Sequence, residues 1–296
     1  MNRNFLVPLD GSTESELVLT EVQRIATVRD NVHLLHVVPP LRSPAGLEAA
    51  QVIAILEQAL NYLRATREKW LPGQRGLDLV RPGEPAEGIL GLALEKNINL
   101  IAMTTHARHG LGRLLLGSVA SEVVRKAQLP VLLTRPDLRR PSRAIQRILL
   151  TVEGRETPQD LLETVKTLTG GSKTEIILFH VVAAVKDPAP QWGPAASFST
   201  LSLPEHRLQE QADALEKEGY TAWPLVSTGE ATAEILTQAA KLDVDLIALA
   251  PHARIGLERL FEGSVAEGVL RKSSVAVLLQ KPLKVQKPVL LGERHE

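Results

Sequence analysis

The sequence contains no cysteine in its 296 residues. This absence excludes a disulfide framework, a thiolate nucleophile and a cysteine-ligated zinc site. Charge of one sign is not in excess either, because 34 Lys and Arg residues balance 34 Asp and Glu residues. Nothing in that balance favours DNA, RNA or an anionic membrane as a partner.

Long apolar runs are also missing. No stretch of ~18–20 apolar residues is available to cross a bilayer. The opening segment, MNRNFLVPLDGSTES, has no apolar core followed by a small-residue cleavage site, so it does not read as a signal peptide. We therefore expect a soluble, cytoplasmic protein without a membrane partner.

Catalytic motifs are absent as well. The chain has no Gly-x-x-x-x-Gly-Lys-Ser/Thr loop, no Gly-x-Ser-x-Gly elbow, no His-Glu-x-x-His and no strand followed by Gly-x-Gly-x-x-Gly. We expect no enzyme, although slow nucleotide hydrolysis stays open, because a bound triphosphate with Mg²⁺ needs little more than positioning.

What the sequence does contain is an internal repeat. THARHGLGRLLLGSVASEVV (105–124) returns 146 residues later as PHARIGLERLFEGSVAEGVL (251–270), with 12 of 20 positions identical. Other matched segments keep offsets of 143 to 146 residues: 4–10 with 147–153, 34–38 with 178–182, 82–90 with 228–236, and 99–103 with 245–249. The repeat unit is therefore a whole domain, in a chain about twice the usual domain length of ~100–200 residues.

Each copy alternates short apolar runs with helical segments. The runs are 4–10, 34–38, 100–104 and 130–134 in copy one, and 147–153, 178–182, 246–250 and 276–280 in copy two. Segments such as 85–97 and 118–128 have helical character and lie between the runs. This alternation predicts an α/β fold of two tandem doubly wound parallel-sheet domains, which bind ligands at the carboxyl ends of their strands.

Composition places the domain boundary in TRPDLRRPSRAIQ (134–146), which is rich in Pro and Arg and has no apolar periodicity. We predict domain one at residues 1–136, a linker at 137–146, domain two at 147–282 and a tail at 283–296. Residues 185–204 are predicted to be a mobile loop before a helix. Trp192 and Phe198 in that loop could form a lid or partner contact, but packing on their own domain is the favoured alternative.

The candidate phosphate site is Gly117-Ser118-Val119, which opens a predicted helix. A helix N-terminus offers unpaired backbone N–H groups and a positive dipole end to an anion. Gly117 lets the backbone approach the ligand closely, and Ser118 adds a hydroxyl. The alternative is that Ser118 merely caps its helix.

This segment, together with VPLDGS (7–12), resembles the universal stress protein family, and the resemblance covers essentially the whole chain as two copies. Nucleotide-binding members are similar to one another in Gly-x-x-Gly, nine residues, then Gly-Ser/Thr. The chain keeps the final Gly-Ser but replaces both leading glycines, reading Thr104-x-x-Ala107 before Gly117-Ser118 and Ala250-x-x-Ala253 before Gly263-Ser264.

The resemblance implies a site for ATP or a related adenine nucleotide, with Mg²⁺, and it implies roles position by position. Asp10, which follows Pro8 and Leu9, matches an acid that contacts the adenosine part. The other matched positions of copy one belong to the adenine pocket, the end of the third strand, the two replaced glycines and the triphosphate cradle: Val37, Met103, Thr104, Ala107, Gly117, Ser118 and Val119. Copy two has Thr151-Val152-Glu153 in place of Pro8-Leu9-Asp10 and keeps Val181, Gly263, Ser264 and Val265.

The lost glycines matter through their backbone angles. A residue with a Cβ costs ~1–2 kcal/mol in the left-handed region, and the Cβ also blocks close approach of a phosphate. Thr104 could compensate by donating its hydroxyl to a phosphate oxygen. Copy one is therefore expected to be weakened and copy two to bind less well than copy one.

Other polar residues receive structural interpretations beside functional ones. His36 and His180 lie within buried strands and are read as hydrogen-bonded core residues rather than ligands. The residues of the candidate phosphate loops either fix those loops, face solvent or touch a nucleotide: His106, His252, Arg108, Arg113, Arg254 and Arg259. Asp10 and Glu153 occupy equivalent places in separate copies, which argues against a paired-carboxylate site.

Two functions follow. The first is an ATP-responsive stress protein, in which nucleotide bound chiefly to domain one shifts conformation or the affinity for a protein partner. The second is an interaction protein that binds no nucleotide and works through dimer contacts. Family domains commonly pair through their last strands, here 130–134 and 276–280, so the resemblance implies a pseudo-dimer within the chain and a homodimer of chains beyond it. We expect the copies to be related by a near two-fold axis and not to share a single continuous sheet.

Overall fold

The computed structural model describes residues 2–40, 49–105, 117–138, 144–153, 158–170, 174–183, 195–250 and 265–281, with residues 195–202 described in their backbone only. The first half of the chain forms β1 (Asn4–Pro8), α1 (Thr13–Glu16), α2 (Val18–Ile25), β2 (Asn31–Val38), α3 (Ala49–Trp70), β3 (Asp78–Pro82), α4 (Pro85–Glu95), β4 (Leu100–Thr104), α5 (Ser118–Lys126) and β5 (Val131–Thr134). The second half forms β6 (Arg147–Thr151), α6 (Gln159–Thr169), β7 (Glu175–Ala183), α7 (Ala195–Lys217), β8 (Thr221–Gly229), α8 (Ala231–Lys241), β9 (Leu246–Leu249), α9 (Val265–Lys272) and β10 (Ala276–Leu279).

Each half is a parallel sheet with the doubly wound strand order. The order is β3-β2-β1-β4-β5 in domain one and, mirrored, β10-β9-β6-β7-β8 in domain two. The central strands are apolar and buried along their whole length, as in β4 and β9, because helices cover both faces of the sheet. The predicted fold of two tandem doubly wound α/β domains is confirmed.

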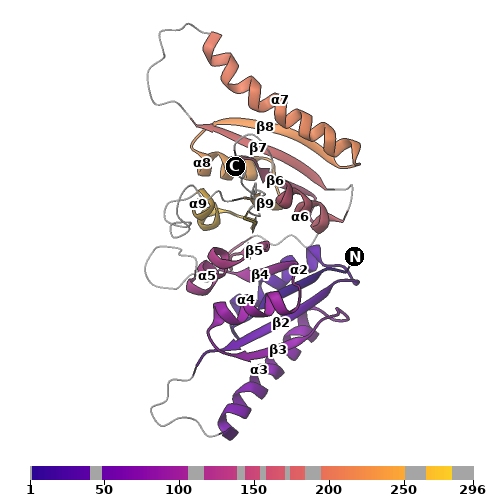
Figure 1. Cartoon of the computed structure of the whole chain (residues 1–296), viewed down its shortest axis with the longest axis vertical. Helices are drawn as coiled ribbons and strands as arrows, with labels where there is room; N and C mark the ends of the chain where they lie inside the picture. The colour runs from indigo at the N-terminus through magenta and orange to yellow at the C-terminus, as the bar shows by residue number, and fades with distance from the viewer. Residues whose placement is uncertain are drawn as a thin grey trace, which may run out of the picture.

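The two halves join through β5 and β10, which pair antiparallel at the centre of Figure 1. Leu132 lies opposite Leu278, which is its own counterpart 146 residues later in the repeat. The neighbouring pairs are likewise exchanged by swapping the copies, so a near two-fold axis passes through the Leu132–Leu278 pair. Pairing through the last strands is confirmed.

The expectation against a single continuous sheet was wrong. All the strands named above belong to one ten-stranded sheet. Pairing through last strands makes this unavoidable, because those strands are sheet edges whose unpaired backbone N–H and C=O groups hydrogen-bond to each other.

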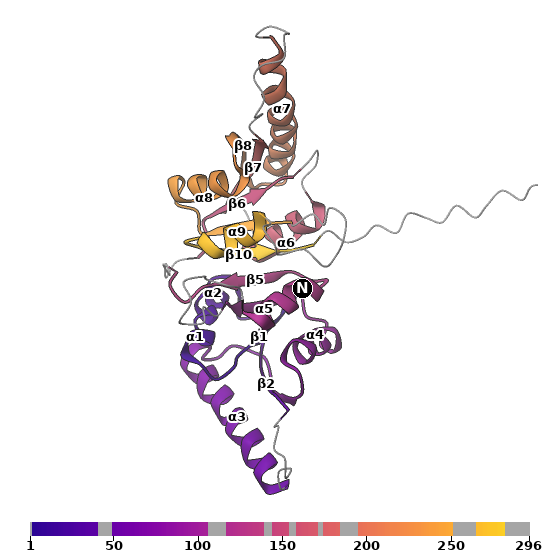
Figure 2. The same cartoon turned by 90° about the vertical axis from the view of Figure 1, so that its left-hand side faces the viewer.

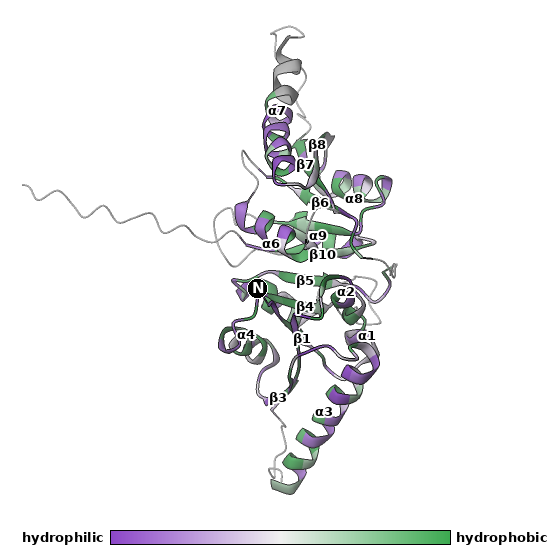
Figure 3. Ribbon diagram, turned by 90° about the vertical axis from the view of Figure 1, so that its right-hand side faces the viewer, coloured by the Kyte–Doolittle hydropathy of each residue, from purple (hydrophilic) through white to green (hydrophobic). Residues whose placement is uncertain are grey.

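The helices form two layers over this sheet. Buried residues of α2 and α6 belong to one apolar cluster, and buried residues of α4, α5, α8 and α9 belong to the other. Each cluster draws residues from both domains. Figure 1 places α2 and α6 on one side of the junction and α5 and α9 on the other. Figure 3 shows the apolar strands between these layers.

Two features of the fold were missed or misjudged in the sequence. The edge strands β3 and β8 were not predicted, since their residues are mostly half-buried and each contains a proline, Pro82 or Pro224. Residues 195–204 were predicted as loop but belong to α7, which begins directly after Pro194 and includes Pro204.

The α3 and α7 helices lie at opposite ends of the molecule (Figure 2). No helix in the described ranges is long and apolar enough to cross a membrane.

Candidate functional site

A cavity of about 290 Å³ opens at the carboxyl edge of the domain-one sheet. It lies where the strand order reverses between β1 and β4, the usual ligand position in doubly wound sheets. The structure brings together all the copy-one candidates in its described ranges, which line this one cavity: Pro8, Leu9, Asp10, Val37, Met103, Thr104, Gly117, Ser118 and Val119. Five lining residues were not selected from the sequence: Ser15, His36, Pro39, Pro85 and Ile89.

Asp10 is positioned by the turn between β1 and α1. Its Oδ1 accepts hydrogen bonds from the Ser12 backbone N–H, at 3.0 Å, and from the Ser12 hydroxyl, at 2.6 Å. The Ser12 side chain in turn caps α1 by accepting from the Ser15 N–H. Gly11, between Asp10 and Ser12, has φ of +90°, a backbone conformation that is strained in residues with a side chain. The carboxylate is therefore held at the cavity rim by hydrogen bonds to the turn.

The α5 helix begins at the cavity. Gly117 is its N-cap residue, with φ of −56° and ψ of 152°, and no side chain hydrogen-bonds to this cap. Ser118 is the first helical residue and is exposed, so the alternative that Ser118 caps the helix was wrong. A helix of this length presents its first N–H groups and positive dipole end to whatever lies before it. The start of α5 lines the cavity through Gly117, Ser118 and Val119.

Thr104 is buried, at 7% exposure, at the end of β4. Its hydroxyl donates to the Ser15 carbonyl oxygen at 3.3 Å, so it is directed at the protein rather than at a phosphate position. Among the described residues only Asn97 and Asp243 have positive φ without being glycine. Replacing the family's glycine by Thr104, or by Ala250 in copy two, therefore causes no left-handed strain, and only side-chain bulk remains as its effect.

The apolar wall of the cavity depends on close packing between α4 and β2. A Cβ built on Gly88 would lie 3.0 Å from Cγ2 and 3.2 Å from Cγ1 of Val37. Val37 is 9% exposed and lines the cavity. The missing side chain at Gly88 thus lets the helix approach the strand and fixes how far Val37 protrudes.

The two strand histidines differ. His180 fits the predicted hydrogen-bonded core residue, because its Nδ1 lies 2.7 Å from the Val152 carbonyl oxygen. His36 does not, since its buried Nδ1 has no hydrogen-bond partner among the described residues and its ring lines the cavity. The His36 ring meets Tyr62 edge-on, with 6.1 Å between the ring centroids. Burial raises the pKa of Tyr62, so this neighbour is a neutral phenol.

A second cavity, of about 260 Å³, lies at the equivalent place in domain two. It is lined by Thr151, Val152, Glu153, Phe179, His180, Val181, Ala231, Ile235 and Val265. Two retained copy-two candidates, Val181 and Val265, are among them, whereas Gly263 and Ser264 lie outside the described residues. The remaining predictions outside those residues are Ala107, Ala253, Trp192, the side chain of Phe198, the tail, and the histidines and arginines of the candidate phosphate loops.

The geometry defines a class of protein: two fused doubly wound α/β domains, each with a cavity at the carboxyl edge of its strands. The model of the universal stress protein family matches residues 1–135 and again residues 144–281. The chain belongs to the universal stress protein family.

Individual relatives agree with this assignment. A universal stress protein of Mycolicibacterium smegmatis is 23% identical over 94% of this chain and 96% of its own length. One from Methanocaldococcus jannaschii is 28% identical over 46% of this chain and 96% of its own length, so it corresponds to a single domain. The crystal structure of a universal stress protein from Archaeoglobus fulgidus covers 94% of this chain and 96% of its own, with a TM-score of 0.69 and 19% identity.

Proposed function

We propose that this chain binds ATP or a related adenine nucleotide, with Mg²⁺, chiefly in domain one, and that binding alters its conformation or its affinity for a protein partner in a stress response. The observation that carries the proposal is that every described copy-one candidate, from Pro8 to Val119, lines one cavity.

The cavity suits the two ends of such a ligand. Its volume of about 290 Å³ accommodates an adenosine group between apolar walls that include Val37, Ile89 and Met103. Asp10 at the rim accepts hydrogen bonds from ribose hydroxyls. The phosphates lie toward Gly117 and Ser118, where backbone N–H groups at the start of α5 favour an anion. Binding rather than catalysis is the proposed role.

One observation favours the alternative of an interaction protein without nucleotide. The Thr104 hydroxyl donates to the Ser15 carbonyl, so the side chain that replaces a family glycine adds bulk and no donor toward a phosphate. This second function would rely on protein contacts alone, including a homodimer of chains.

Two measurements separate the functions. Mass spectrometry of small molecules released from the denatured, purified protein identifies a co-purified nucleotide. Calorimetric titration with ATP then compares Asp10→Ala with the matched variant Glu153→Ala. We expect a loss of about ten-fold in affinity at Asp10, or ~1.4 kcal/mol, and a smaller loss at Glu153, because copy one keeps more of the family pattern.

Equal losses in the two variants, or a larger loss at Glu153, would reverse the assignment of the main site to domain one. Absence of ATP binding by the original protein at millimolar concentration would favour the interaction protein.

A further inference from the structure

A buried ion pair crosses the domain junction at the amino-terminal edge of the strands. Arg24 of α2 donates from Nη2 to Oδ1 of Asp245, which directly precedes β9, at 2.8 Å. The two side chains are 5% and 2% exposed. Glu21, on the same helix, accepts from the other terminal nitrogen of Arg24 at 2.7 Å. The second oxygen of Asp245 accepts the backbone N–H groups of Gln146 and Arg147.

The repeat supplies the equivalent junction for comparison. The buried positions of α2 return 143 residues later in α6, which makes Thr167 the counterpart of Arg24. Asn99, which directly precedes β4, is the counterpart of Asp245 at an offset of 146. Neither counterpart is charged. The two junctions are therefore equivalent in backbone but differ in the charge of these side chains.

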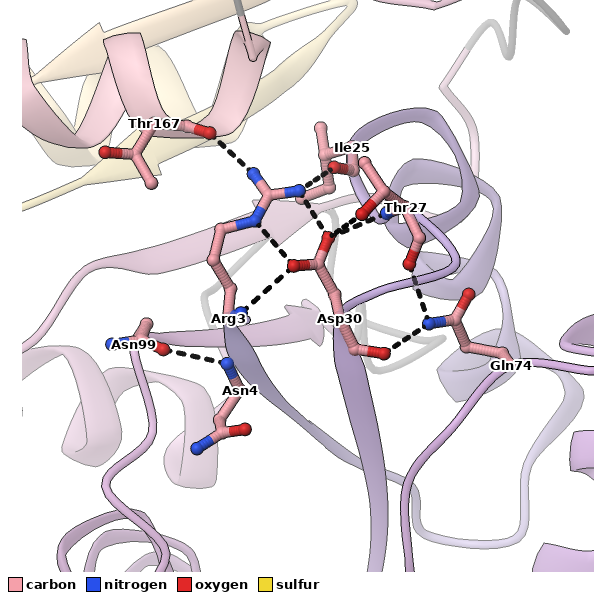
Figure 4. A network of polar contacts seen from close by, with 8 residues as sticks. All are labelled: Arg3, Asn4, Ile25, Thr27, Asp30, Gln74, Asn99 and Thr167. Carbon is pink, nitrogen blue, oxygen red and sulfur yellow. Dashed lines mark hydrogen bonds and ion pairs between the residues drawn. The ribbon is translucent and has the colours of Figure 1, made fainter. Parts of the chain in front are cut away.

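The equivalent junction is closed by a different contact, shown in Figure 4. Arg3 Nη1 reaches across from domain one to the Thr167 carbonyl oxygen at 2.6 Å. The rest of the Arg3 guanidinium pairs with Asp30 of its own domain. Asn99 accepts the backbone N–H of Asn4 at 2.7 Å, within domain one.

The opposite edge of the junction remains symmetric. Arg135 after β5 donates to the carbonyl oxygen of Arg271, near the end of α9, at 2.5 Å. Its counterpart Lys281 after β10 donates to the carbonyl oxygen of Arg125, near the end of α5. Cations at helix C-termini complement the helix dipole in either domain. These contacts, like the backbone pairing of β5 with β10, would form between any two copies and do not choose a partner.

We propose that the Arg24–Asp245 pair makes the junction surface selective, so that domain one accepts domain two and rejects a second copy of itself. In a pair of two first domains, Arg24 would face Asn99 and no carboxylate would cross the junction. In a pair of two second domains, Asp245 would face Thr167 and no cation would cross it. In a wrong pair Arg24 would keep Glu21 and Asp245 would keep its two backbone N–H donors, but each buried ion would lose its oppositely charged partner across the interface. That loss is unfavourable, and such losses are one way in which an interface discriminates against wrong partners.

Selectivity has a consequence for the two cavities. The edge strands β5 and β10 pair with each other within one chain, so each pair of domains contains one domain-one cavity and one domain-two cavity. Chain-to-chain association must then use surfaces other than β5 and β10.

The test uses the complete chain with a specific protease site inserted after Pro141 and cleaved after folding. Unlabelled and ¹⁵N-labelled nicked proteins are mixed until the isotopes have exchanged among the paired domains. Native mass spectrometry then counts pairs of one domain of each kind against pairs of identical domains. The variant is Arg24→Thr/Asp245→Asn, which places Thr and Asn at these two positions in both junctions and removes the ion pair between the domains. Arg24→Gln/Asp245→Asn is a second variant that retains hydrogen-bonding groups.

In the original protein we expect the ratio of mixed pairs to identical-domain pairs to exceed its random value, which is about one, by about ten-fold or more, and in both variants we expect this ratio to fall toward the random value. Arg81→Gln/Glu95→Gln, which removes an ion pair between β3 and α4, should leave the proportion unchanged. Random pairing in the original protein, or undiminished preference for mixed pairs in a variant, would overturn the proposal.

Discussion

Gly88 offers a direct test of how the domain-one cavity is built. The change is Gly88→Ala in α4, where the new Cβ would lie 3.0 Å and 3.2 Å from the two methyl carbons of Val37. The Val37 side chain must then move by a few tenths of an ångström. It can do so by shifting toward the cavity that it lines.

The expected magnitudes come from two opposing effects. Crowding a packed contact costs ~1–3 kcal/mol. Replacing a glycine within a helix by alanine stabilises by ~1 kcal/mol. The net loss in free energy of unfolding should therefore be ~0–2 kcal/mol, while ATP affinity falls by about ten-fold because Val37 intrudes on the ligand space.

Gly91→Ala is the matched control on the same helix. Its Cβ would come no closer than 3.8 Å to the Arg81 guanidinium, which is an ordinary contact. This variant should gain up to ~1 kcal/mol and bind ATP unchanged. Urea unfolding and calorimetric titration measure both properties. Equal stability and equal affinity of the two variants would refute the idea that contact with Val37 sets the cavity wall.

Three further outcomes are expected. Thr104→Gly/Ala107→Gly should increase the ATP-dependent rise in melting temperature, compared with its own ligand-free control; an unchanged rise in a folded variant would show that these side chains do not limit affinity. Burial alone would raise the pKa of the Asp30 carboxyl group, but hydrogen bonds from its arginine and threonine partners outweigh burial and lower the pKa well below 3.8. The contribution of the Asp30 carboxylate to the free energy of unfolding is therefore complete above pH 3.8 and is lost as the pH falls below that value. Asp30→Asn should therefore cost about 3 kcal/mol at pH 7 and flatten the acid limb of a urea-denaturation profile; an unaltered acid limb would contradict this. Gly76→Ala should destabilise by more than ~3 kcal/mol, because residue 76 has φ of +145° and the new Cβ would lie 1.9 Å from a backbone oxygen. The control Gly73→Ala is also at positive φ but has open space around it, so thermal unfolding should show a cost of only ~1–2 kcal/mol.

Much of the candidate site followed from the resemblance to the universal stress protein family, which implied Asp10 and Met103 as site residues. The strand pattern agrees with that assignment, because the carboxyl ends of parallel strands meet at one sheet edge. His36 was misjudged because periodicity places it in a buried strand but says nothing about which side chain opposes it. The hydroxyl direction of Thr104 was equally inaccessible, since its acceptor, Ser15, lies 89 residues away in the chain.

The sequence by itself determined the number of domains and their fold, which follow from local apolar patterning and from a repeat whose offset varies by only a few residues. The strands through which the domains pair were implied by the resemblance to the universal stress protein family. Only the tertiary structure decided that both sheets fuse into one and that a carboxylate before β9 meets an arginine of α2. The reason is physical: pairing between residues 221 positions apart depends on how two finished surfaces meet, and neither surface exists until its own domain has folded.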